Sequence, residues 1–136
     1  MSSINRTAQQ DGHKLTRNVA ALMVFEAATL AVASGLHLAG TVQGRSLPFN
    51  PDGAGIAEAV IGIVLAAAAV VMFRSPARAR PVGLAATGFA IVGFLVGLNF
   101  TARGGHLPDV TYHLVMLPIL VGGLIALLRA PSDRRP

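Results

Sequence analysis

With 136 residues, of which 53% are hydrophobic and only 12% are charged, the chain has too few charged residues to cover a soluble core, and its composition favours a membrane protein. The formal net charge of +5 does not indicate nucleic-acid binding, because the basic residues flank apolar segments and do not alternate with aromatic ones. The absence of cysteine excludes disulfides, thiolate metal sites and iron–sulfur clusters on this chain.

Residues 1–17 are polar and have no helical or strand periodicity, so they are predicted to be a polar cytoplasmic tail without a fold of its own. An apolar segment follows and contains Glu26. An alternative treats its first part as a secretory signal peptide that is cut after the small residues at 31–33. We favour a retained span, because Glu26 interrupts the apolar core of such a signal and the apolar run continues beyond the cut.

Four apolar segments are long enough to cross about 30 Å of hydrocarbon as helices. They cover about residues 18–39, 54–73, 81–101 and 110–128. Short connections make neighbouring helices antiparallel, so the predicted fold class is an all-α integral membrane up-down four-helix bundle over residues 18–129, followed by a basic cytoplasmic tail at 130–136.

Basic residues are divided unequally between the two ends of this bundle. Nine of the eleven lie in the two terminal tails and between the second and third spans, whereas Arg45 and Arg103 lie at the other end. Because basic segments stay in the cytoplasm, both termini are predicted to be cytoplasmic. Ten of the eleven basic residues are arginine, which suits a GC-rich bacterial genome, so the predicted location is the bacterial inner membrane.

The connecting segments carry signals for helix ends. Residues 40–53 and 102–109 are predicted to be outer loops, in which Asp52 and Asp109 precede spans and accept hydrogen bonds from backbone N–H groups. Residues 74–81 are predicted to be a tight basic turn with prolines at its edges.

Gly93 and Gly97 form a GxxxG pattern in the third span. Such glycines let helix backbones approach closely, which favours packing inside the bundle and leaves a homodimer through the Gly93/Gly97 face as an alternative. The predicted partners are therefore the lipid bilayer and either a second copy or a membrane partner subunit.

Each span contributes one polar side chain near its outer end. These candidates for binding a ligand or a metal are His37, Glu58, Asn99 and His113. A weak internal repeat aligns "GLHLAG" with "GLNFTA", so that His37 corresponds to Asn99 and Glu58 corresponds to His113 in the two halves of the chain. Because a polar side chain that faces lipid costs on the order of a few kcal/mol, all four are predicted to point inward and meet.

Other polar residues lie near this layer or below it. Thr101 and Tyr112 could add hydroxyl groups, and His106 could act as a lid or as a ligand at the mouth. Glu26 precedes His37 by eleven residues, so it lies on the same helix face about 16 Å deeper. A carboxyl group at that depth, with no basic residue beside it, is a candidate for relaying protons.

Several functions fit these residues. The polar layer could serve only to fix the register of the helices, as in a membrane scaffold or interaction subunit. Two histidines and a carboxylate could hold a transition metal such as iron, zinc, manganese or copper, although no two of them share a helix at ligand spacing. Haem ligation by His37 and His113 is a further alternative.

A third class of function is the binding of a small lipophilic molecule such as a quinone, or proton-coupled transport by a homo-oligomer with Glu26 and His37 as relay. No catalytic triad and no phosphate-binding loop is present, so no enzyme class is indicated.

The four short spans and the polar segments "GLHLAG", "AEAVIG" and "DVTYHLVMLP" resemble the small bacterial four-helix membrane proteins that include the DoxX-like families. The resemblance covers residues 18–129 at the level of architecture. It implies a membrane subunit linked to quinone or thiol redox chemistry, often with a partner. The functional prediction is therefore a small binding or accessory subunit for a metal or a lipophilic redox ligand.

Overall fold

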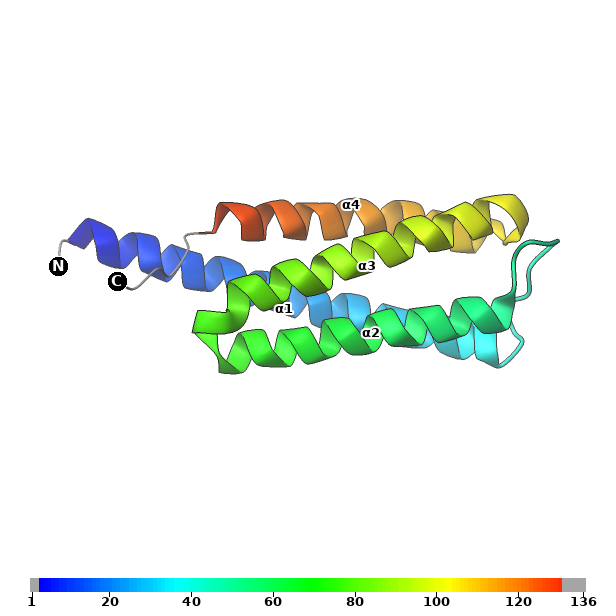
Figure 1. The fold of residues 1–136 in the computed structure, drawn as a ribbon, viewed down its shortest axis with the longest axis horizontal. Helices are drawn as coiled ribbons and strands as arrows, with labels where there is room; N and C mark the ends of the chain where they lie inside the picture. The colour runs from blue at the N-terminus through cyan, green and yellow to red at the C-terminus, as the bar shows by residue number, and fades with distance from the viewer. Residues whose placement is uncertain (1–2, 131–136) are drawn as a thin grey trace.

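A computed structural model describes residues 3–130, and its helices run along one long axis (Figure 1). They are α1 (Ser3–Leu38), α2 (Pro51–Arg74), α3 (Pro76–Gly104) and α4 (Leu107–Arg129). No strand occurs within residues 3–130, which confirms the predicted all-α class. All four helices are long and apolar enough to cross a membrane, which indicates a multi-pass protein in contact with the lipid bilayer.

The connections lie at two ends of the molecule. Figure 1 shows the 39–50 connection and the α3–α4 connection at one end, here called the loop end, and the α2–α3 connection at the opposite end. Helix α1 packs mainly against α2, and α3 packs against both α2 and α4. Residues of the loop end are therefore close together although they are far apart in the sequence.

Helix α1 begins at Ser3, so the segment 3–17 is helical where the sequence predicted no fold. The segment contains no proline, and each residue added to an existing helix gains a backbone hydrogen bond at little further cost. The Thr16 hydroxyl donates to the carbonyls of Gly12 (3.2 Å) and His13 (3.0 Å), which stabilises the same stretch.

Helix α1 ends in a Schellman motif directly after His37. The Thr41 N–H donates to the Leu36 carbonyl (3.0 Å), and the Gly40 N–H donates to the His37 carbonyl (3.0 Å). Gly40 has φ of +69°, a left-handed conformation that glycine adopts without the cost of a Cβ clash. The motif fixes the last turn of α1 and hence the position of His37.

Proline sets the beginnings of the other three helices, each of which has a proline at its first or second position. A proline there loses no intrahelical hydrogen bond, so α2 begins at Pro51, earlier than predicted. The acceptor at the start of α2 is the Asn50 side chain, which accepts from the N–H groups of Asp52 (3.0 Å) and Gly53 (3.3 Å). The prediction that Asp52 supplies this cap is therefore wrong.

The predicted turn at 74–81 is much shorter, because Ser75 alone separates α2 from α3. Pro76 opens α3 and Pro81 lies inside it. The Arg80 guanidinium donates to the carbonyls of Leu127 (3.0 Å) and Leu128 (3.2 Å), which lack helical partners at the end of α4. These bonds attach α3 to α4 at the opposite end.

The core is built from small and aliphatic side chains. Its fully buried members include Ala20, Met23, Leu30, Leu65, Ala69, Ala90, Phe94, Leu120 and Leu127. Gly93 and Gly97 face this core: an added Cβ would lie 2.5 Å from Ile61 Cδ1 at Gly93 and 2.5 Å from His113 Nε2 at Gly97. Gly93 and Gly97 therefore allow close packing between helices of the same chain.

Candidate functional site

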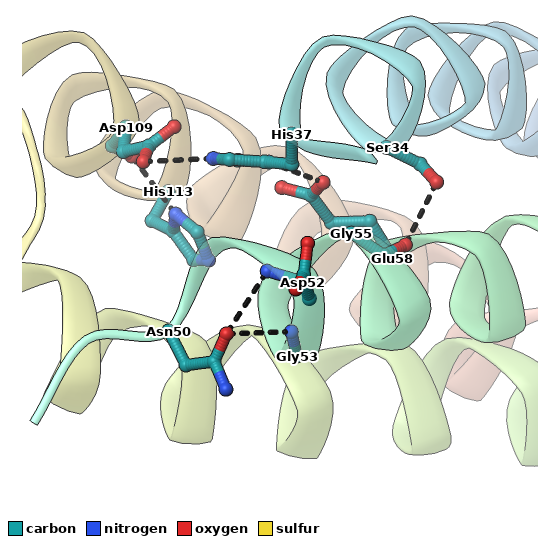
Figure 2. A network of polar contacts seen from close by, with 9 residues as sticks. All are labelled: Ser34, His37, Asn50, Asp52, Gly53, Gly55, Glu58, Asp109 and His113. Carbon is teal, nitrogen blue, oxygen red and sulfur yellow. Dashed lines mark hydrogen bonds and ion pairs between the residues drawn. The ribbon is translucent and has the colours of Figure 1, made fainter. Parts of the chain in front are cut away.

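The loop end holds a buried network centred on His37 (Figure 2). Its Nδ1 lies 2.8 Å from Oε2 of Glu58 on α2, and its Nε2 lies 3.1 Å from Oδ2 of Asp109 on α4. All three residues are at least nine-tenths buried. One imidazole therefore links three helices through two hydrogen bonds.

The two hydrogen bonds of His37 restrict how protons are arranged. Each bond needs one proton, so two protons are shared by one imidazole and two carboxyl groups. Either His37 is an imidazolium between two carboxylates, or His37 is neutral and one carboxyl group is protonated. Both arrangements carry one net negative charge, so a proton can change place within the network without a change of net charge.

His113 lies beside this network, and its tautomer follows from its bonding. Its Nδ1 is 2.8 Å from the backbone carbonyl of Asp109, one turn earlier in α4. Because a carbonyl only accepts, Nδ1 carries the hydrogen, and Nε2 of the neutral ring is an acceptor. The absence of a side chain at Gly97 makes room for this nitrogen. The His113 ring also packs on Phe94, with 5.2 Å between centroids.

The predicted polar layer is only partly assembled. Glu58 bonds to His37, and His113 bonds to the backbone carbonyl of Asp109. Asn99 is exposed and takes no part in the network. It lies two residues from Gly97, which on a helix is the other side. Asp109, which was predicted only as a helix cap, supplies the third member.

The accessory candidates have separate positions. Thr101 is buried and its hydroxyl donates to the Leu98 carbonyl of its own helix (3.3 Å). The Tyr112 hydroxyl is 3.0 Å from the Thr29 hydroxyl and so connects α4 with α1. His106 is half-buried at the N-cap of α4, and its side chain makes no cap hydrogen bond.

Glu26 lies deeper in the bundle on the same face of α1 as His37. Its side chain is 2% exposed. Among the described residues, Oε1 of Glu26 has no hydrogen-bond partner. Within residues 3–130, no hydrogen bond joins Glu26 to the His37 network, and its role as a proton relay stays a prediction.

An apolar groove lies between α2 and α3 and has a volume of about 560 Å³. Its walls include Ala57, Val60, Phe89, Val92, Val96 and Phe100. Glu58 and His113 reach it from the side of the network. The groove is therefore mostly apolar and borders the polar side chains of the candidate site.

A second cavity of about 350 Å³, here called the outer pocket, lies under the 39–50 connection. It is bordered by His37 together with the exposed residues Arg45 and Asp52. Phe49 lines both the outer pocket and the α2–α3 groove, and its ring centroid lies 5.9 Å from that of His37. Phe49 therefore forms an apolar wall between the two spaces.

A third cavity, the α1–α4 groove, has a volume of about 510 Å³ and is lined by His37, Asp109 and Tyr112 among apolar side chains.

Within residues 3–130, no group of three or more His, Asp or Glu side chains is arranged to hold a metal ion. The chain matches no family model, no curated protein and no solved structure. The site must therefore be interpreted from its own geometry.

Proposed function

We propose that this chain is a small bacterial inner-membrane protein that binds a lipophilic molecule with a hydrogen-bonding head group in the α2–α3 groove. The observation that carries the proposal is the volume of about 560 Å³ with Glu58 and His113 on an otherwise apolar wall. Pockets that bind small molecules have this size and are lined mostly by apolar side chains with a few polar groups. A quinone-class molecule, with an apolar tail and oxygen atoms on its ring, has matching chemistry.

The polar groups would orient the head of the ligand. Nε2 of His113 accepts a hydrogen bond, because Nδ1 donates to the Asp109 carbonyl. The Glu58 carboxyl group has one oxygen bonded to His37 and lines the groove as well. A hydroxyl group on the ligand could donate to either residue, while its tail lies along Val92 and Val96.

The proposed arrangement in the membrane is an up-down bundle with both termini cytoplasmic and the loop end outside. The supporting observation is the position of Arg74, Arg78 and Arg80 around the α2–α3 connection, at the end opposite to the 39–50 connection. Of the basic tail predicted at 130–136, residues 131–136 lie outside the described residues. The DoxX-like resemblance, which implies quinone-linked chemistry, agrees with this choice of ligand and stays a prediction.

The experiment is a titration of the purified protein in nanodiscs with a short-tailed benzoquinol. His113→Leu removes the acceptor, and we expect a dissociation constant about tenfold higher, as for the loss of one hydrogen bond. Ala57→Trp fills the groove and should abolish binding. Ala31→Trp is the matched control, because Ala31 is also an exposed helical alanine but does not line the groove.

Wild-type protein that fails to bind the benzoquinol, or binds it equally well with Ala57→Trp, would contradict the proposal. Binding that is lost in Ala57→Trp but retained in Ala31→Trp would locate the ligand in the groove.

A further inference from the structure

We propose that His37 transfers protons between a ligand in the α2–α3 groove and water in the outer pocket, so that the ligand is a lipophilic phenol or quinol with an ionisable hydroxyl group. The inference rests on the proposed function, because it needs a ligand in that groove. It adds the chemical class of the ligand and a role for a side chain that does not line the groove.

The geometry places His37 between the two spaces. Glu58 lines the groove, His37 lines the outer pocket, and Nδ1 of His37 is 2.8 Å from Oε2 of Glu58. Phe49 lines both spaces and separates them with an apolar ring. The hydrogen bond between Glu58 and His37 is thus a polar connection through an otherwise apolar wall.

The proton balance of the network suits such a transfer. Two protons are shared over Glu58, His37 and Asp109, and their arrangements have equal net charge. An imidazole can take a proton at one ring nitrogen and release one from the other. Uptake of a proton by Glu58 and release of another from His37 to water therefore leave the net charge of the network unchanged.

The step is a proton transfer in which no electron moves. The O–H bond of the ligand breaks, and an O–H bond forms on the Glu58 carboxylate. His37, as the imidazolium, then releases the proton of Nε2 to water in the outer pocket, directly or through Asp109, and the neutral ring keeps its hydrogen on Nδ1, bonded to Glu58. The ligand is left as a phenolate, and one proton has entered the aqueous phase.

The groups around His37 determine how this transfer responds to pH. Glu58 faces it from α2, and Asp109 faces it from α4. Arg45 and Asp52 border the outer pocket, and His113 lies beside Asp109 with its Nδ1 already bonded. A rise in the pH of the outer pocket draws protons out of the network, so it favours the ionised ligand.

The test uses an alkylated 4-nitrophenol as the probe, because its phenolate absorbs visible light. The full chain in nanodiscs is loaded with the probe, stepped from acidic to alkaline buffer in a stopped-flow instrument, and followed by absorbance. We expect His37→Gln to slow ionisation of the bound probe by about 10²-fold, since glutamine cannot take up and release a proton. His106→Gln is the matched control at the same end of the molecule and should behave like wild type.

Asp109→Asn provides a second variant that keeps the shape of the side chain and should also slow the ionisation. The methyl ether of the probe, which has no proton to give, measures binding alone and should bind to wild type and to both variants equally. This comparison separates a loss of transfer from a loss of binding or folding.

Wild-type rates of ionisation in both His37→Gln and Asp109→Asn would overturn the inference and leave the proposed function standing. If neither the probe nor its methyl ether binds to wild type, the proposed function fails, and the inference fails with it. Slow ionisation in both variants with unchanged binding of the ether supports the inference.

Discussion

His37 and Glu26 lie on one face of α1, and each is 2% exposed, yet their surroundings differ completely. Both ring nitrogens of His37 have carboxyl partners, whereas Oε1 of Glu26 has none among the described residues. Burial of a polar side chain therefore does not by itself identify a site. The partners that other helices supply at the same depth make the difference.

The surroundings of His37 and Glu26 differ because the neighbouring helices carry different residues at the two depths. At the loop end, Glu58 lies about two turns into α2 and Asp109 lies in the first turn of α4. Both are opposite the last turn of α1. Around the middle of the bundle the buried side chains are mainly small or aliphatic, such as Leu65 and Ala90. A polar group there finds few partners.

The largest expected effect comes from His37→Ala. It leaves Glu58 and Asp109 buried without their common partner, and breaking such a buried pair costs about 3–5 kcal/mol. Thermal unfolding in detergent should show a markedly lower midpoint than for the control His106→Ala. A midpoint equal to that of the control would show that the network contributes nothing to stability.

Gly97→Ala tests the space beside the same network. The added Cβ would lie 2.5 Å from His113 Nε2, and such overpacking costs about 1–3 kcal/mol. Gly88→Ala on the same helix is the control, because its Cβ would meet nothing within 4 Å. Equal unfolding midpoints for the two variants would contradict the packing described here.

Asn50→Ala extends the comparison to the connections at the two ends. Asn50 accepts two backbone hydrogen bonds at the start of α2, so its loss should cost about 1 kcal/mol. Ser75 at the start of α3 makes no side-chain cap bond, so Ser75→Ala should change the free energy of unfolding by less than about 0.5 kcal/mol. Chemical denaturation of the two variants measures the difference, and a larger loss for Ser75→Ala would reverse the argument.

Glu26→Gln should have the smallest effect. The amide keeps the size of the side chain and removes an ionisable group that lacks a partner at Oε1, so we expect a change of about 0.5 kcal/mol or less in the free energy of unfolding. Glu58→Gln is the informative counterpart, because it weakens a bond to His37 and should destabilise more. A loss of stability for Glu26→Gln as large as that for Glu58→Gln would mean that Glu26 has a partner after all.

Apolar length predicted the four helices well, because crossing hydrocarbon demands about 20 apolar residues whatever the details of packing. The ends of the helices were predicted less well. Pro51 and Pro76 were interpreted as parts of loops, although each occupies the first position of a helix. A proline signals a helix start and a turn equally well when only the sequence is known.

Depth along each helix was predictable, but the direction of each side chain was harder to infer. Asn99 has the right depth and points away, because Gly97 and Thr101 occupy the inward face of α3. Asp109 could have been found from the periodicity of α4. The residues spaced by four, three and four along its buried face are Asp109, His113, Met116 and Leu120. The cavities depend on the angles between helices, which no local pattern of residues determines.

Ser75 alone connects α2 to α3, so the two helices lie close together at this end. Figure 1 shows the two helices diverging from this connection toward the loop end. At that end, the N–H groups of Arg45 (2.7 Å) and Ser46 (3.2 Å) hold the Gly104 carbonyl at the tip of α3. The space between α2 and α3 is thus bounded at one end by the Ser75 connection and at the other end by the two backbone bonds from the 39–50 connection to α3.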